Sequence, residues 1–194
     1  FYILDSNAQS DLTLWYKSPA KVWEEALPVG NGRLGAMIFG DPQKERIQFN
    51  ENTLYSGEPE TPKDINVASD LGHIRQLLNE GKNTEAGNII QQKWIGRLNE
   101  AYQPFGDLYI EFASKGAITD YIHSLDMNNS IVTTSYKQNG IAIRREVFAS
   151  YPAQAIIIHL SASKPVLNFT AHLESPHPVT QDSDSQAIYL KGQA

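Results

Sequence analysis

Apolar and polar residues alternate along much of the second half of the chain, which is the pattern of β-strands with one buried face. In the segment 107–112, for example, Leu108, Ile110 and Phe112 fall on one face. The Asn139-Gly140 dipeptide separates two such segments and favours a type I′ turn, so we expect a β-hairpin there. Strands at spacings of roughly 10 residues are typical of sandwiches and barrels. The expected strands are 107–112, 118–127, 130–138, 141–150, 154–163 and 167–175.

The first half of the chain contains further strand-like segments. Residues 12–16 form a short apolar and aromatic run. Residues 33–41 and 46–57 are expected to be two strands joined by a turn that starts at Asp41-Pro42. The polar segment 179–186 is expected to be a loop. We therefore predict a mainly β fold, a large antiparallel β-sandwich of the super-sandwich type.

Between residues 67 and 95 the apolar spacing changes from that of a strand to that of a helix. Gly81 marks the end of the first helix, and a second helix is expected from about residue 84 to residue 94, with Asn83 as its N-cap. We interpret residues 67–95 as a helical hairpin inserted into a single β-sandwich domain that covers residues 1–194. The apolar face of the first helix consists of Leu71, Ile74, Leu77 and Leu78.

Composition and charge exclude several classes of protein. The chain has 194 residues, 41% of them apolar, and a net charge of −6, so it lacks the basic footprint of a nucleic-acid-binding protein. It has no cysteine, which excludes disulfides and thiolate metal sites. No apolar stretch approaches the roughly 20 residues that span a bilayer. We expect neither nucleic acid nor membrane as a partner, and no cofactor.

The five histidines do not suggest a metal site. His159 and His172 lie in expected strands that could be neighbours, and we expect each to be a partly buried strand residue. His177 lies between prolines in a loop and is the better candidate for a contact residue. No metal site is therefore predicted.

The glycine-rich segment 30–35 reads GNGRLG and matches the letters of a dinucleotide-binding fingerprint. The residues that follow it are strand-like, so there is no helix N-terminus to receive a pyrophosphate. The favoured interpretation is a tight turn with glycine at positive φ, and close packing of strands at Gly35 and Gly40. A sugar contact or an interface contact remains the alternative.

Two further residue classes bear on carbohydrate chemistry. The carboxylates Glu24, Asp41, Glu51 and Glu58 show no spacing that would bring two of them together as the acid and base of a glycosidase. Aromatic side chains can stack on sugar rings, although filling of the core is the more common role. The candidates for stacking are Trp15, Trp23, Trp94, Tyr55 and Tyr102.

Four segments taken together resemble glycoside hydrolase family 95, the family of α-L-fucosidases and related α-L-galactosidases. They are WEEALPVGNGRLGAM at 23–37, NENTLYSG at 50–57, YQPFGDLYIEF at 102–112 and YIHSLDMNNSIVTTSYKQNGIAIRREVFASYP at 121–152. The resemblance as a whole extends from about residue 14 to residue 160. One departure is Tyr55, where the family pattern more often has tryptophan.

The resemblance implies an N-terminal β-sandwich domain followed by a helical linker, a catalytic (α/α)6 barrel and a C-terminal β domain. In such enzymes the catalytic groups of an inverting hydrolysis lie in the barrel. They are a glutamate acid and asparagines that, with an aspartate, activate water. No catalytic residue is therefore assigned to this chain. We expect the chain to be a fragment of a longer, periplasmic or extracellular hydrolase, although a cytoplasmic location is also compatible.

Two main hypotheses follow for the function. The first is a non-catalytic N-terminal domain that packs on the barrel of the same polypeptide and shapes its pocket for a fucosylated or related oligosaccharide. The second is a free-standing carbohydrate-binding module, and an autonomous hydrolase is a third possibility for which we expect no turnover. For the first we assign substrate-rim or domain-interface roles to Asn31, Arg33, Glu51, Asn52 and Tyr102.

Overall fold

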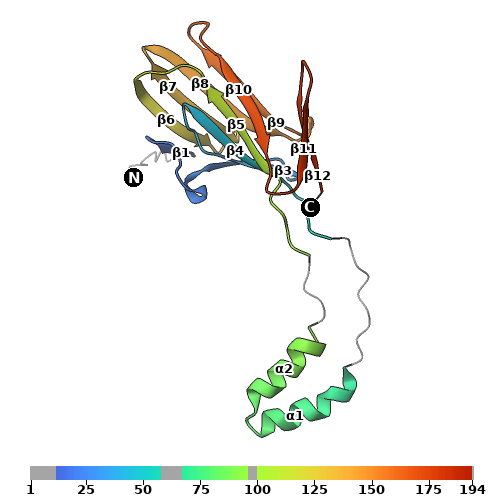
Figure 1. Ribbon diagram of the computed structural model, residues 1–194. Helices are drawn as coiled ribbons and strands as arrows, with labels where there is room; N and C mark the ends of the chain where they lie inside the picture. The colour runs from blue at the N-terminus through green and yellow to red at the C-terminus, as the bar shows by residue number, and fades with distance from the viewer. Residues whose placement is uncertain (1–11, 58–66, 96–99, 194) are drawn as a thin grey trace, which may run out of the picture. The chain divides into compact units, whose positions relative to one another are not determined.

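The computed structural model describes residues 12–57, 67–95 and 100–193. The chain divides into two compact units (Figure 1). The first unit contains the strands and comprises the described residues up to Leu54 and from Gln103 onward. The second unit, Tyr55–Tyr102, contains the two α-helices. Each unit is described below by itself.

The first unit consists of antiparallel sheets, which confirms the predicted β-sandwich. One five-stranded sheet has the order β1-β6-β7-β8-β9, the other has the order β10-β5-β4-β3-β2, and β11 pairs with β12 (Figure 1). The strands are β1 (Thr13–Tyr16), β2 (Leu27–Gly30), β3 (Leu34–Ile38), β4 (Lys44–Glu51), β5 (Gly106–Phe112), β6 (Ile118–Asp126), β7 (Ile131–Gln138), β8 (Ile141–Ser150), β9 (Ala155–Ala162), β10 (Phe169–Glu174), β11 (Val179–Ser183) and β12 (Ile188–Gly192). A short 3-10 helix, Trp23–Glu25, precedes β2.

Alternate residues of the two five-stranded sheets form the core. Ile38 of β3 and Ile47 of β4 are buried against Val132 of β7 and Val147 of β8 in one apolar cluster. Because successive side chains of a strand point to opposite faces, the alternation in the sequence places every second residue in this core. The two sheets are therefore held together by burial of apolar surface, which is the dominant favourable contribution to folding.

Two turns have the conformations that their sequences favour. Asn139 and Gly140 connect β7 to β8 with φ of 51° and 76°, the positive values that a type I′ turn requires. At the β3–β4 turn, Oδ1 of Asp41 accepts hydrogen bonds from the backbone N–H of Gln43 at 2.7 Å and of Lys44 at 2.8 Å. Both turn predictions are confirmed.

The expected loop at residues 179–186 is wrong for its first part, because Val179–Ser183 is strand β11. It pairs with β12 in a two-stranded sheet, and all its residues after Val179 are exposed. A strand whose residues are exposed needs no alternation of apolar and polar residues. The sequence of Val179–Ser183 therefore lacks the pattern by which a strand is recognised.

The second unit contains the expected pair of helices, α1 (Leu71–Asn79) and α2 (Asn83–Lys93), after a 3-10 turn at Ala68–Asp70. Ile74 and Leu77 of α1 are buried together with Ala86 of α2. Asn83 is the first residue of α2, and no side chain caps that helix, so the N-cap prediction is wrong. The helix begins one residue earlier than expected because the backbone N–H of Ala86 already bonds to the carbonyl of Lys82, at 3.2 Å.

Candidate functional site

The glycine-rich turn between β2 and β3 is organised by the side chain of Asn31. Its Oδ1 accepts hydrogen bonds from the backbone N–H groups of Arg33 at 3.1 Å and Leu34 at 2.8 Å. Its Nδ2 donates to the carbonyl of Ser150 at the end of β8, at 2.9 Å. Asn31 thus ties the turn in one sheet to a strand of the other sheet.

The glycines of this segment have different roles. Gly32 has a φ of +90° with open space around it, so the expectation of a turn glycine at positive φ is confirmed. Close packing is confirmed at Gly40, where a Cβ would lie 2.7 Å from the hydroxyl of Tyr121 and 2.8 Å from Cγ of His123. It is wrong at Gly35, where the nearest atom would be 3.8 Å away, an ordinary van der Waals distance. Because no other described segment of the chain approaches Gly35 closely, a side chain would fit at this position.

An ion pair joins the same turn to the end of β4. Nε of Arg33 lies 3.0 Å from Oε1 of Glu51. Oε2 of Glu51 accepts from the N–H of Thr53 at 2.8 Å and from its hydroxyl at 2.6 Å. The hydrogen bonds from Thr53 and Arg33 hold the pKa of Glu51 below its usual range. The backbone N–H of Asn52 donates to the carbonyl of Arg33 at 3.0 Å, which closes the arrangement.

The structure thus brings together four of the residues assigned from the sequence, and we call this group the Asn31 corner. It comprises Asn31, Arg33, Glu51 and Asn52. The side chain of Arg33 is 57% exposed and presents guanidinium donors to solvent, while Glu51 is 15% exposed. A planar guanidinium suits carboxylate or hydroxyl partners. The corner is therefore a preorganised polar surface.

Tyr102, the fifth assigned residue, lies in the second unit. It forms an antiparallel bridge with Tyr55, and the two rings meet edge to face with centroids 5.3 Å apart. Both side chains are 49% exposed. The pair belongs to the second unit, whereas the Asn31 corner belongs to the first.

Those carboxylates considered for acid–base chemistry that the structure describes lie in turns, ion pairs and a 3-10 helix of the fold. Asp41 caps the β3–β4 turn, Glu51 belongs to the Asn31 corner, and Glu24 lies in the 3-10 helix before β2. Glu58 lies outside the described residues. Within the described parts of the chain, no three His, Asp or Glu side chains gather in a group that could hold a metal ion.

His159 and His172 are not neighbours, because β9 and β10 belong to different sheets. His159 is exposed rather than partly buried, with Nδ1 3.1 Å from Glu146 Oε2. His172 is partly buried and stacks on Tyr109 with ring centroids 5.1 Å apart. His177 directs Nε2 to the carbonyl of Pro104 at 2.8 Å, so its contact lies within the chain. Alternation assigns a residue to a face, but not its strand to a sheet.

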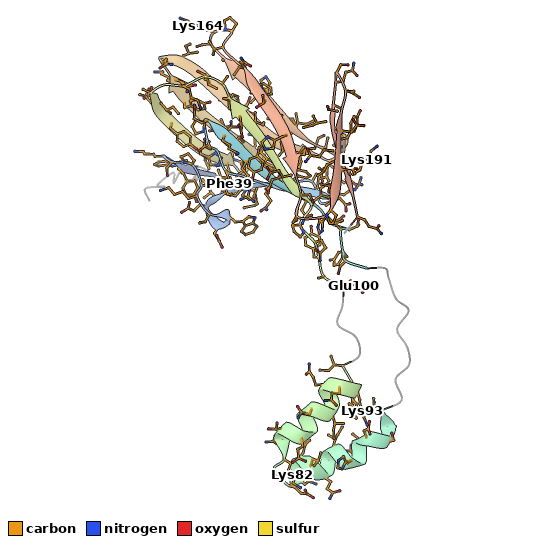
Figure 2. All side chains as sticks on the ribbon, in the orientation of Figure 1. Phe39, Lys82, Lys93, Glu100, Lys164 and Lys191 are labelled. Atoms are coloured by element: carbon orange, nitrogen blue, oxygen red, sulfur yellow. The ribbon has the colours of Figure 1, made fainter. Side chains whose placement is uncertain are left out.

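A buried polar cluster between the sheets was missed by the sequence reasoning. Glu45 of β4 and Arg145 of β8 are 0% and 1% exposed and form an ion pair. Oε1 of Glu45 also accepts from the backbone N–H groups of Phe39 at 3.1 Å and Gly40 at 2.9 Å. Phe39 is labelled within the sandwich in Figure 2. Burial raises the pKa of Glu45, and Arg145 and the two amides act against that rise.

Three side chains of the opposite sheet hold the β3–β4 turn through its backbone carbonyls. Tyr121 donates to the carbonyl of Gly40 at 2.8 Å, Arg145 to that of Asp41 at 3.1 Å and Tyr136 to that of Pro42 at 3.2 Å. Burial raises the pKa of both tyrosines, so they remain protonated donors. These bonds satisfy turn carbonyls that would otherwise be buried without partners.

His123 completes the buried cluster. Its Nε2 lies 3.1 Å from the carbonyl of Ile38, and its Nδ1 lies 3.0 Å from the hydroxyl of Thr134. A carbonyl can only accept, so Nε2 carries the proton and Nδ1 accepts from Thr134. Burial lowers the pKa of His123 to about 4, which keeps the ring neutral.

A signal for this cluster was present in the sequence. Arg145 stands between the apolar Ile143 and Val147, and Glu45 stands two residues before Ile47. All are on inward-facing positions of their strands. A charged residue at an apolar position of the alternation indicates a buried ion pair, since a lone buried charge is costly.

Comparisons with known proteins show what the chain is similar to. Residues 14–194 match the family described as glycosyl hydrolase family 65, N-terminal domain. The chain is 35% identical to alpha-L-fucosidase 2 of Arabidopsis thaliana over 187 residues, which is 93% of this chain and 22% of that protein.

Two fungal proteins are also similar. The chain is 28% identical over 193 residues to a protein of Aspergillus niger named probable alpha-fucosidase A, covering 91% of the chain and 24% of that protein. It is 28% identical over 191 residues to the protein of the same name from Aspergillus oryzae, covering 93% of the chain and 26% of that protein. The chain thus spans about a quarter of the length of the curated relatives it matches.

Proposed function

The chain belongs to the family of glycosyl hydrolase family 65 N-terminal domains, and on this premise we propose that it is the non-catalytic N-terminal domain of an inverting α-L-fucosidase-like hydrolase. The resemblance to the N-terminal domain of a glycosyl hydrolase is confirmed by the family match. The assignment to glycoside hydrolase family 95, with fucosides or α-L-galactosides as substrates, is part of the proposal.

The observation that carries this proposal is how the chain aligns with its relatives. Between 91% and 93% of the chain aligns with proteins named as fucosidases, yet it covers only 22–26% of their length. Each of these relatives therefore contains a region similar to this chain together with a much larger remainder. We propose that the remainder is a catalytic barrel in the same polypeptide and that this domain packs against it.

The Asn31 corner is the surface that we propose for that contact. Its backbone is held by Asn31 across both sheets, so it can present Arg33 without further ordering. Preorganised groups bind with a smaller entropic cost than mobile ones. In this role Arg33 pairs with carboxylate or hydroxyl groups at the rim of the sugar pocket.

The proposal is tested by comparing this chain with the longer polypeptide that contains it. With an aryl α-L-fucoside, we expect turnover by the longer polypeptide and none by residues 1–194 alone. The first product observed by proton NMR should be the β-anomer, because the proposed hydrolysis inverts the configuration. Turnover by the isolated chain would contradict a non-catalytic role, and an initial α-anomer would contradict inversion.

The role of the corner is tested in the longer polypeptide by Arg33→Ala. We expect lower activity or a lower Tm, with Lys164→Ala as a control at an exposed position remote in sequence (Lys164 in Figure 2). If Arg33→Ala leaves both activity and Tm unchanged, the corner is not an interface.

A further inference from the structure

The second unit carries two exposed aromatic rings in a fixed arrangement. Tyr55 and Tyr102 are paired in an antiparallel bridge although they are far apart in the sequence. The N–H of Ser56 donates to the carbonyl of Ala101 at 2.9 Å, which fixes the backbone beside the bridge. The positions of both rings are therefore set by backbone pairing and by their edge-to-face contact at 5.3 Å.

Such a pair is well suited to binding because little ordering remains to be done. A tyrosine side chain has two χ angles and offers a large contact area at a low entropic cost. Each of these two side chains keeps 49% of its surface exposed. Aromatic rings of this kind are enriched where one side of a residue packs and the other meets a ligand or partner.

A carboxylate lies beside the tyrosine pair. Oε2 of Glu100 accepts a hydrogen bond from the hydroxyl of Ser56 at 3.1 Å, and the same hydroxyl accepts from the N–H of Ala101 at 3.0 Å. Gly57, with a φ of +77°, leaves the room for this arrangement, because a Cβ there would lie 2.7 Å from the carboxylate of Glu100. Glu100 is labelled in Figure 2. A carboxylate in this position can accept hydrogen bonds from ligand hydroxyl groups.

We propose that Tyr55, Tyr102 and Glu100 form a carbohydrate-binding ledge that takes one pyranose ring of an oligosaccharide. The C–H face of the ring packs on a tyrosine, and ring hydroxyls donate to Glu100. This combination of an apolar surface and a few placed polar groups is what small polar ligands require. The choice of a fucosylated oligosaccharide as the ligand rests on the proposed function, while the ledge itself rests on the geometry of the second unit.

The ledge is tested by direct binding to the 194-residue chain. Saturation-transfer difference NMR, followed by titration, measures the affinity for 2′-fucosyllactose, for methyl α-L-fucopyranoside and for lactose. We expect Tyr102→Ala and Tyr55→Ala each to lower the affinity for the preferred sugar about three- to tenfold, the scale of one aromatic contact. Tyr102→Phe keeps the ring and should retain most of the affinity.

The matched control is Tyr151→Ala, which removes a tyrosine that is 71% exposed in the first unit. It should leave sugar binding unchanged. For each variant, the α-helical signal in the circular dichroism spectrum verifies that the helices of the second unit are folded. Glu100→Gln keeps the shape but weakens acceptance of hydroxyl donors, so it should lower the affinity less than loss of a ring.

Two results would overturn the ledge. One is the absence of saturation transfer from the wild-type chain with all three sugars at millimolar concentration, which would leave the tyrosines as a packing surface. The other is sugar binding that Tyr55→Ala and Tyr102→Ala reduce no more than Tyr151→Ala does. Neither result depends on whether the longer polypeptide cleaves fucosides, so failure of the ledge and failure of the proposed function are distinguishable.

Discussion

The substitution Glu45→Gln tests whether the buried ion pair holds the two sheets together. Glutamine has nearly the shape of glutamate, and its Oε1 can still accept from the N–H groups of Phe39 and Gly40. Its amide NH2 would replace Oε2, the atom that faces Nη2 of Arg145. The substitution therefore leaves a positive charge that is 1% exposed without its counter-charge, and sets a donor against a donor.

The expected magnitude follows from burial. Removing one partner of a buried ion pair costs about 3–5 kcal/mol, because the remaining charge is neither solvated nor paired. For a domain of this size that loss corresponds to a fall in Tm of about 6–20 °C. It is a large part of the free energy of unfolding of a typical domain, about 5–15 kcal/mol.

Urea denaturation followed by circular dichroism measures the effect. Glu111→Gln is the matched control. Glu111 forms an ion pair with Lys44, the residue before Glu45 in β4, but this pair is exposed, with 44% of the Glu111 side chain and 55% of the Lys44 side chain accessible to solvent. We expect the unfolding midpoint of this control to be unchanged, since exposed ion pairs contribute little. If Glu45→Gln shifts the midpoint no more than Glu111→Gln, the buried pair does not stabilise the sandwich.

A double variant separates the charge from the hydrogen bonds. Glu45→Leu together with Arg145→Met removes both charges, and replacement of a whole buried pair by apolar residues is often tolerated. The loss should be smaller than the sum of the losses of the two single variants, by roughly 2 kcal/mol. The double variant should still be less stable than the wild type, because the N–H of Gly40 loses its acceptor, whereas the N–H of Phe39 retains the carbonyl of Arg46. Additive losses would show that the two side chains are not coupled.

Two further predictions concern the same region. The pKa of His123 is lowered from 6.5 to about 4 in the folded protein, so its contribution to the free energy of unfolding is full above pH 6.5 and falls by about 3 kcal/mol as the pH decreases toward 4. Urea titrations at several pH values should show this decrease in the wild type but not in His123→Gln. Gly40→Ala should destabilise the sandwich by at least about 2 kcal/mol, because Gly40 has a positive φ and a Cβ there would lie too close to Tyr121. Gly140→Ala, at a similar φ of +76° but in open space, should cost about 1 kcal/mol. Equal midpoints for the two alanine variants would refute the packing argument.

Much of the fold could be predicted because its signals are local. The alternation in 107–112 identifies β5, and the Asn139-Gly140 turn identifies the β7–β8 hairpin. Residues 67–95 show helical spacing, which identifies the two helices. Each signal involves residues that are a few positions apart, where the geometry of a strand, turn or helix acts directly on the choice of residue. The exposed strand β11 carries no such signal and was missed.

The candidate site was predictable in part. The polar residues of the glycine-rich segment and of NENT were expected to share a role, and four of them do meet in the Asn31 corner. The hydrogen bond from Asn31 to Ser150 was not predictable, because it joins strands of different sheets. Tyr102 was assigned the same substrate-rim or interface role; it pairs with Tyr55 in the second unit, and its role stays a prediction.

By itself, the sequence determined the positions of most strands, the hairpin turn, the helical pair and the resemblance to the N-terminal domain of a glycosyl hydrolase. Only the tertiary structure decided which strands share a sheet and which charged side chains meet between the sheets. Glu45 and Arg145 are 100 positions apart, and their contact depends on the register of β4 and β8 and on the stacking of two sheets. Alternation assigns each residue to the inner or outer face of its own strand, but a partner across the core exists only once the sheets have packed.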